Sequence, residues 1–95
     1  MIIQVVKFKS NLSEEELFKI VKERKSEFQK ITALKQKYYF KDVMTGEYGG
    51  VYLWESKEAM QEFQQTELAK TIGAAYQISE KPKIEIYQVF MPLRD

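Results

Sequence analysis

The sequence contains no cysteine and no histidine among its 95 residues. The missing cysteine excludes disulfides, thiolate nucleophiles and cysteine-ligated metals. The missing histidine removes the most common general base, the Ser-His-Asp triad and most transition-metal sites. Any reaction must therefore use tyrosine, tryptophan, lysine, arginine, carboxylate or amide side chains, or rest on the reactivity of the substrate. We expect no metal.

Strong net charge and long apolar runs are also missing. The net charge of +1 at pH 7 gives no electrostatic argument for nucleic acid or acidic lipid. No apolar run approaches the roughly 20 residues that span a bilayer, and residues 1–8 lack the pattern of a signal peptide. We expect a cytoplasmic protein without membrane or nucleic-acid partners, folded as a single domain over residues 1–95.

Short apolar and aromatic segments bounded by turn residues predict four strands. The strands are expected at residues 2–9, 33–42, 48–55 and 83–91. Gly46 can take a positive φ in the turn at residues 43–47. An even number of loop residues pairs Tyr38 with Leu53 and Tyr39 with Tyr52, whereas an odd number exchanges these partners.

Serine caps predict two helical segments between these strands. Ser13 and Glu16 have the spacing of a capping box at the start of an amphipathic helix over residues 13–29. Ser56 caps a second segment whose periodicity breaks at residues 64–66. We expect there two short helices or one bent helix, ending near residues 73–76. The order β-α-β-β-α-β is the ferredoxin-like α+β arrangement, with a four-stranded antiparallel sheet.

The hairpin at residues 33–55 is apolar or aromatic on both faces. Right-handed crossovers place both helical segments on one face of the sheet, and the chain is too short to cover the other. The sequence therefore predicts a homodimer that pairs through the open face. Strand alternation places Leu34, Tyr38 and Phe40 on one face of the sheet. It places Tyr39, Tyr52 and Trp54 on the other face, which we expect to form the dimer interface together with Tyr87.

The same hairpin resembles the small YdhR-type proteins, candidate mono-oxygenases of the dimeric α+β barrel (antibiotic-biosynthesis-monooxygenase-like) superfamily. The resemblance covers nearly the whole chain. It is carried by residues 35–42, by the turn Thr45-Gly46-Glu47 and by the strand Gly49-Gly50-Val51-Tyr52-Leu53-Trp54. It implies a ferredoxin-like monomer whose sheet pairs face to face with a second copy to form a barrel.

The resemblance also implies an activity. Better-understood relatives oxidise aromatic polyketides or phenols with O₂ and without metal, flavin or other cofactor, whereas the haem-handling relatives use histidine, which this chain lacks. The function expected is a cofactor-independent mono-oxygenase for a small aromatic or phenolic substrate. The alternative is a non-catalytic homodimer that binds a small molecule. An enolate or phenolate can itself reduce O₂. The protein therefore need only deprotonate the substrate, orient it and shield it from water.

Candidate site residues are large aromatics and one arginine, for a pocket between helices and sheet. The catalytic candidates are Tyr38, Trp54 and Arg24. Of the two aromatic residues, one can hydrogen-bond a substrate oxygen and the other can stack on a substrate ring. Arg24 can bind an anionic oxygen. Substrate-binding candidates are Tyr76, Tyr52 and Phe28.

Each candidate also has a structural interpretation. Tyr38 and Trp54 suit sheet or dimer packing, and Tyr76 suits a plug in the core. Arg24 suits an ion pair with Glu23 or Glu27. Three strand lysines are expected to share a face with Tyr39: Lys35, Lys37 and Lys41. They suit either the attraction of an anionic ligand or the protection of a strand edge.

RNA binding is the remaining alternative. The element order is also that of the RNA-recognition motif, and residues 48–54 superficially resemble its stacking strand. Glu47 stands where that motif has a basic residue, and the glycine and aromatic positions are out of register. With a net charge of +1, the sequence argues against RNA.

Overall fold

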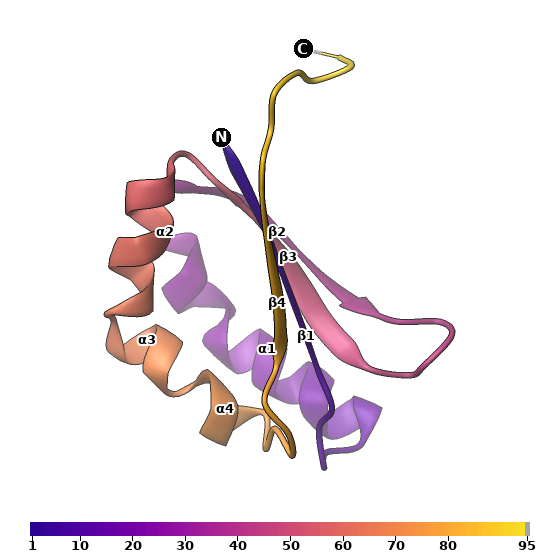
Figure 1. Ribbon diagram of the computed structural model, residues 1–95. Helices are drawn as coiled ribbons and strands as arrows, with labels where there is room; N and C mark the ends of the chain where they lie inside the picture. Colours follow the sequence, from indigo (N-terminus) through magenta and orange to yellow (C-terminus); the bar gives the residue numbers. More distant parts are fainter. Residues whose placement is uncertain (95) are drawn as a thin grey trace.

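The structure is a computed structural model that describes residues 1–94. One four-stranded sheet carries all its helices on one side (Figure 1). The elements in chain order are β1 (Ile2–Phe8), α1 (Glu14–Gln29), β2 (Leu34–Lys41), β3 (Tyr48–Trp54), α2 (Lys57–Gln64), α3 (Glu67–Lys70), α4 (Ile72–Ala75) and β4 (Lys83–Gln88).

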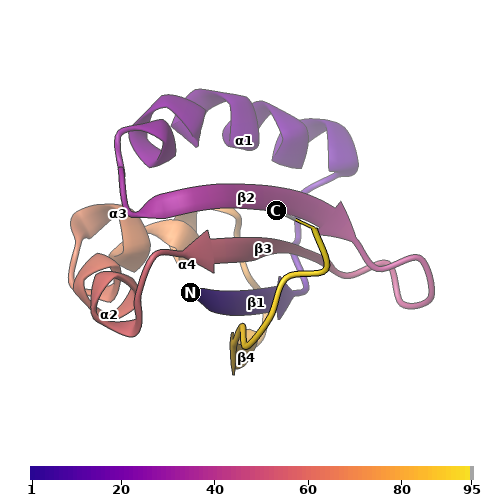
Figure 2. The same ribbon diagram turned by 90° about the horizontal axis from the view of Figure 1, so that it is seen from above.

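The sheet has the order β2-β3-β1-β4, and every neighbouring pair is antiparallel (Figure 2). This order confirms the ferredoxin-like α+β fold. β4 ends at Gln88, three residues before the predicted end at Met91. The last sheet-like hydrogen bond after β4 joins Val89 N to Met1 O at 3.0 Å.

The helix boundaries follow the predicted caps. Ser13 Oγ accepts from Glu16 N at 3.2 Å, and Glu16 Oε1 accepts from Ser13 N at 2.9 Å, which confirms the capping box. The second helical segment is broken, as its sequence indicates, because Thr66 forms a new cap and accepts from Ala69 N at 3.2 Å.

The hairpin register differs from both predicted alternatives. Tyr38 pairs with Val51 and Tyr39 pairs with Gly50, two residues away from the pairing expected for an even loop. Asp42 explains the shift. Its Oδ1 accepts from the backbone N–H groups of Met44 at 2.8 Å and Thr45 at 3.2 Å, so Asp42 belongs to the turn and the loop spans residues 42–47.

The predicted assignment of the two sheet faces is wrong in an important respect. Tyr52 is 5% exposed and Trp54 is fully buried, because both face the helices and form the core with Phe28, Met60 and Phe63. The Tyr52 and Trp54 rings stack at a centroid distance of 5.9 Å. Strand alternation had separated the two sets of side chains but could not say which set meets the helices.

Leu34 and Tyr87 lie on the predicted sides of the sheet, but each is separated from the side chains that were expected to share its face. A β-bulge between Leu34 and Gln36 turns Leu34 toward the helices, where it packs against the core. Tyr87 pairs with Ile3 on the open face. That face remains largely apolar, with a different membership: Ile3, Val5, Tyr38, Phe40, Val51, Leu53 and Tyr87.

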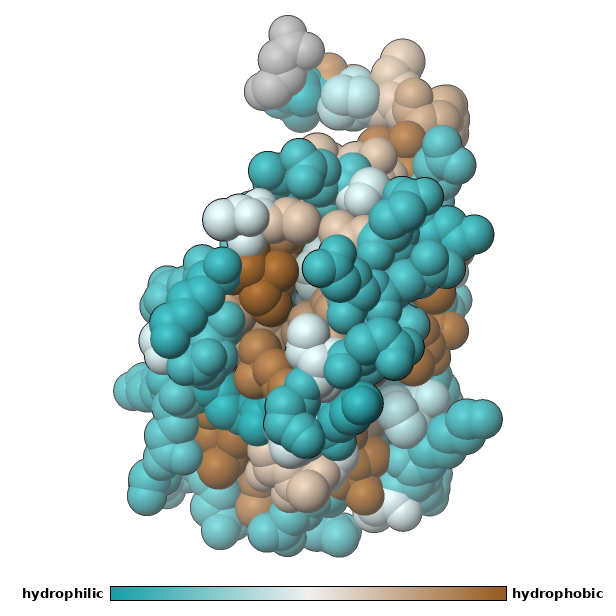
Figure 3. Space-filling view, turned by 90° about the vertical axis from the view of Figure 1, so that its left-hand side faces the viewer, coloured by the Kyte–Doolittle hydropathy of each residue, from teal (hydrophilic) through white to brown (hydrophobic). Residues whose placement is uncertain are grey.

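The helical side is polar outside and apolar within. Hydrophobic side chains show between two hydrophilic bands in the space-filling view (Figure 3). Among the described residues, no helix is both long and apolar enough to cross a membrane.

Gly49 marks the tightest backbone approach in the sheet. A Cβ atom there would overlap Val6 O and lie 2.6 Å from Phe40 Cζ. We expect Gly49→Ala to lower the free energy of unfolding by about 1–3 kcal/mol, because the backbone must shift. Gly73→Ala is the control, since nothing lies within 4 Å of its Cβ position. It should be neutral or stabilising by up to about 1 kcal/mol. Equal urea midpoints for the two variants would contradict this packing.

Candidate functional site

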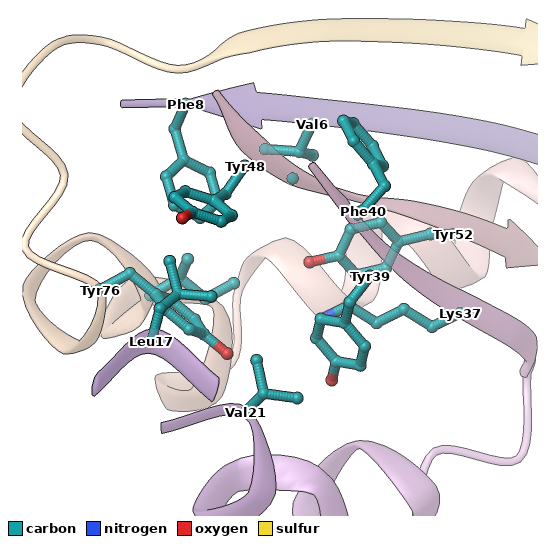
Figure 4. Close-up of a pocket in the computed structure, with 13 residues that line it drawn as sticks. Val6, Phe8, Leu17, Val21, Lys37, Tyr39, Phe40, Tyr48, Tyr52 and Tyr76 are labelled. Atoms are coloured by element: carbon teal, nitrogen blue, oxygen red, sulfur yellow. The ribbon is translucent and has the colours of Figure 1, made fainter. Parts of the chain in front are cut away.

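A small cavity lies between the sheet and the helices (Figure 4). Its volume is about 40 Å³, enough for a few water molecules. Its apolar walls include Val6 and Phe8 of β1 and Leu17 and Val21 of α1. The side chains with polar atoms around it include Lys37, Tyr39, Tyr52 and Tyr76.

Gly50 makes room for this cavity in the central strand β3. Its neighbours on the helix-facing side, Tyr48 and Tyr52, are large, whereas Gly50 has no side chain. A Cβ atom at Gly50 would lie 3.2 Å from Lys37 Cε and 3.4 Å from Tyr52 Cε1. The lysine stem therefore folds over the glycine and brings its amine inward from the edge strand β2.

Lys37 Nζ is enclosed by aromatic rings. It lies 3.6 Å from the ring centroid of Phe28 and 4.4 Å from those of Tyr39 and Tyr52. No salt bridge reaches it within residues 1–94. Burial, and secondly the nearby Arg24 guanidinium, lower the pKa of Lys37 to about 7.

Three tyrosines share this environment. Burial raises the pKa of Tyr76 to about 12, and it also raises the pKa values of Tyr52 and Tyr39, while the charge of Arg24 opposes each shift. These hydroxyls therefore stay protonated at neutral pH and can donate hydrogen bonds. The Tyr76 hydroxyl is buried and finds no partner within residues 1–94, so it has a free donor.

A wider groove adjoins the cavity. It lies between the end of α1 and β2, and has a volume of about 280 Å³. Lys37 and Tyr39 line both spaces. Tyr39 is 39% exposed, so these two side chains form the partition between the buried cavity and the surface groove.

Arg24 connects two helices, and it pairs with no acid among residues 1–94. Its Nη2 donates to Leu68 O at 2.7 Å and to Thr71 Oγ1 at 3.2 Å, which ties α1 to α3. The predicted structural alternative, an ion pair with Glu23 or Glu27, is not formed. Its Nε is buried without a partner within residues 1–94.

The structure does not bring the three catalytic candidates together. Tyr38 is 63% exposed on the open face, on the far side of the sheet from the cavity. Trp54 lies in the core, and its Nε1 donates to Gln4 Oε1 at 2.9 Å. Both positions suit the structural interpretation of these residues.

The substrate-binding candidates lie closer to one another. Tyr52 and Tyr76 line the cavity, and Figure 4 shows their hydroxyl groups directed toward it. Phe28 contributes to the groove and to the ring contacts around Lys37. Their roles in binding remain predictions.

Lys37 is the feature whose importance the sequence did not reveal. The sequence pattern groups it with Lys35 and Lys41 as a strand lysine. The available signal was its alternation with Tyr39, which places it on the same face as the aromatics of β3. Among residues 1–94, no group of three or more acidic side chains could hold a metal ion.

Comparison with solved structures gives whole-chain matches. SnoaB from Streptomyces nogalater, a cofactor-independent oxygenase, matches with a TM-score of 0.77 and 10% identity over 99% of this chain and 97% of its own. The chain has the antibiotic-biosynthesis-monooxygenase-like fold. A candidate antibiotic biosynthesis monooxygenase from Caulobacter crescentus matches with a TM-score of 0.79 and 19% identity, over 95% of this chain and 90% of its own. Another from Deinococcus radiodurans matches with a TM-score of 0.77 and 13% identity, over 100% of this chain and 98% of its own.

The sequence comparisons find no relatives. No family model matches the chain. No curated protein matches it either. The shared fold therefore rests on structure alone, and the YdhR-type resemblance stays a prediction from the sequence.

The free hydroxyl of Tyr76 generates a stability prediction. We expect Tyr76→Phe to raise the free energy of unfolding by about 1 kcal/mol, because it removes a buried polar group without a partner. Tyr48→Phe is the matched control: its exposed hydroxyl contacts Glu14 Oε1 at 3.4 Å, and its loss should change stability by less than about 0.5 kcal/mol. Chemical denaturation measures both. A destabilised Tyr76→Phe would show that the hydroxyl is satisfied in solution.

Proposed function

We propose that this protein is a cofactor-independent mono-oxygenase for a small aromatic or phenolic substrate, bound between the helices and the sheet. The supporting observation is the convergence of the Lys37 amine and the hydroxyls of Tyr52 and Tyr76 on one partly enclosed, largely apolar space. The fold it shares with SnoaB, a cofactor-independent oxygenase, adds support. The proposed cytoplasmic location rests on composition.

The proposed chemistry needs only a base, an oriented substrate and exclusion of water. A substrate with an acidic C–H₂ group beside a phenol or ketone loses a proton to give a carbanion. The carbanion reduces O₂ and forms a C–O bond. One oxygen atom becomes a ketone oxygen, and the other leaves as water with the two hydrogens of the former C–H₂ group. Oriented polar groups in a water-poor site favour these steps.

The dimensions of the site set a condition. The cavity alone, at about 40 Å³, is too small for an aromatic ring. The cavity and the groove together enter the lower end of the range of about 300–1,000 Å³ typical of ligand sites. Substrate entry therefore requires Lys37 and Tyr39 to rotate aside and join the two spaces.

A non-catalytic small-molecule-binding protein is the second candidate. The separation of Tyr38 from Trp54 across the sheet favours it, because these two catalytic candidates do not line one site. In that case the same aromatic walls and hydroxyls bind a phenolic metabolite without reaction.

Oxygen uptake separates the two candidates. We expect chelator-treated protein to consume O₂ with at least one compound from a panel of anthrones, quinols and phenols. Tyr76→Phe should lower kcat/KM by about tenfold or more, because it removes a donor to the substrate oxygen. Trp54 stacks on Tyr52 and provides a fluorescence signal of binding. Fluorescence quenching without O₂ consumption would reject the oxygenase and retain the binding protein.

We further propose that the open face of the sheet pairs with a second copy of this chain. Tyr38 and Tyr87 are 63% and 50% exposed there, beside the partly buried Val5, Val51 and Leu53. The C-terminal segment leaves the end of the sheet (Figure 1) with three more apolar side chains uncovered, Phe90, Met91 and Leu93. A net charge of +1 opposes self-association little.

The available area is compatible with a dimer. From standard strand spacing and rise, a four-stranded face of this length measures roughly 450 Å² in projection. Side-chain relief and the C-terminal segment raise this area toward the about 800 Å² per partner that specific complexes bury. Two charged pairs, Lys7 with Asp42 at 2.7 Å and Lys83 with Glu47 at 3.4 Å, lie at the end near the hairpin turn. Glu85, opposite Val5, adds a charge farther along the open face, where it accepts from the Tyr87 hydroxyl at 2.6 Å.

Sedimentation tests this dimer. We expect twice the mass of one chain at micromolar concentration, and dissociation in Tyr38→Asp and Val51→Asp, which place a charge in the buried interface. Phe18→Asp is the control, because Phe18 is a similarly exposed aromatic, 57% accessible, on the outer side of α1. A monomeric wild-type protein, or dissociation only in Phe18→Asp, would reject pairing through the sheet.

A further inference from the structure

We propose that Lys37 is the proton acceptor of this site: its amine takes the hydroxyl proton of a phenolic ligand and holds the phenolate as an ion pair beside the rings of Phe28, Tyr39 and Tyr52. In this step the O–H bond breaks, an N–H bond forms, and the electron pair stays on the oxygen. The inference rests on the proposed phenolic ligand class and adds the residue that ionises the ligand.

The first support is the position of the amine. Lys37 lies on the partition between the enclosed cavity and the surface groove. A ligand that joins these spaces must pass its Nζ. The aliphatic stem crosses Gly50, where a larger residue would press on Lys37 Cε, so the sheet itself directs the amine toward the cavity.

The second support is the absence of a competing acid. No salt bridge involves Lys37 within residues 1–94, and its pKa of about 7 leaves a large uncharged fraction at neutral pH. The groups that face it are cationic or phenolic. They are Arg24 and Lys25 from α1, Lys35 and Tyr39 from its own strand, Tyr52 from β3 and Tyr76 from the end of α4.

The third support is that these surroundings favour the ion pair once it forms. Ring faces at 3.6–4.4 Å attract an ammonium group. A phenolate beside Nζ raises the lysine pKa again, and the cation lowers that of the phenol. The free hydroxyl of Tyr76 can donate to the phenolate oxygen. The site should therefore prefer the more acidic phenols.

The alternative role for Lys37 is purely structural, as an ammonium group packed on aromatic rings at a strand edge. That role predicts no ionisation of a bound phenol. It also predicts that an arginine, which packs on rings equally well, would bind ligands with the same proton balance as lysine.

The test uses 2-naphthol, whose absorption distinguishes phenol from phenolate, at about pH 8, between the pKa of Lys37 and the roughly 10 of a phenol. We expect wild-type protein and Lys41→Met to bind it as the phenolate. Lys41 is the matched control, because it shares the strand and face of Lys37 but pairs with Glu14 at 3.1 Å outside the cavity. Lys37→Met should bind at least about tenfold more weakly and leave the ligand neutral.

Proton balance provides the decisive arm. Binding to the wild-type protein moves the phenol proton to Lys37 and releases little to solvent. Lys37→Arg is already charged, so it should release about one proton for each naphthol bound as phenolate. Calorimetry in two buffers of different ionisation enthalpy measures this difference, and circular dichroism checks that both variants fold.

Three results would overturn the inference: neutral naphthol bound to the wild-type protein, phenolate bound equally by Lys37→Met, or no binding of naphthol at all. The outcome is independent of oxygen chemistry. Ionisation of naphthol together with no O₂ uptake from any compound of the anthrone, quinol and phenol panel would retain the role of Lys37 and reject the mono-oxygenase.

Discussion

The site depends on a lysine amine, Lys37 Nζ, that is packed against three aromatic rings, and no carboxylate of residues 1–94 forms a salt bridge with it. Gly50 makes this possible, because the absence of a side chain on the central strand lets the stem of Lys37 cross from the sheet edge. Burial disfavours the ammonium form, and Arg24 adds to the effect while it ties α1 to α3. The same contacts that hold the helices on the sheet therefore set the protonation of the site.

The two faces of the sheet have separate tasks that meet in β2. Its helix-facing side chains, Lys37 and Tyr39, close the cavity, and its opposite side chains, Tyr38 and Phe40, belong to the apolar open face. β2 is also an edge strand. In the proposed dimer, pairing through the open face would fix the position of β2 and, with it, the partition that a ligand must open.

The sequence predicted the element order, the capping box at Ser13, the broken second helical segment and an apolar open face, since each follows from local periodicity or cap residues. It could not predict which side of the hairpin meets the helices, so Tyr52 and Trp54 were assigned to the wrong surface. The Asp42 turn and the bulge near Leu34 shifted the register beyond what alternation shows. Lys37 could not be recognised from the sequence because its environment depends on Phe28 of α1 and Tyr52 of β3, which only the tertiary packing brings around its amine.

The titration of Lys37 tests the central claim most directly. Selective isotope labelling and NMR can follow its ε-methylene signals as a function of pH, with Lys37→Met used for assignment. We expect a midpoint near pH 7, because the amine is buried among rings and beside Arg24. A midpoint near the ordinary lysine value of 10.5 would show that the amine is solvated and charged in solution, and would contradict the site described here.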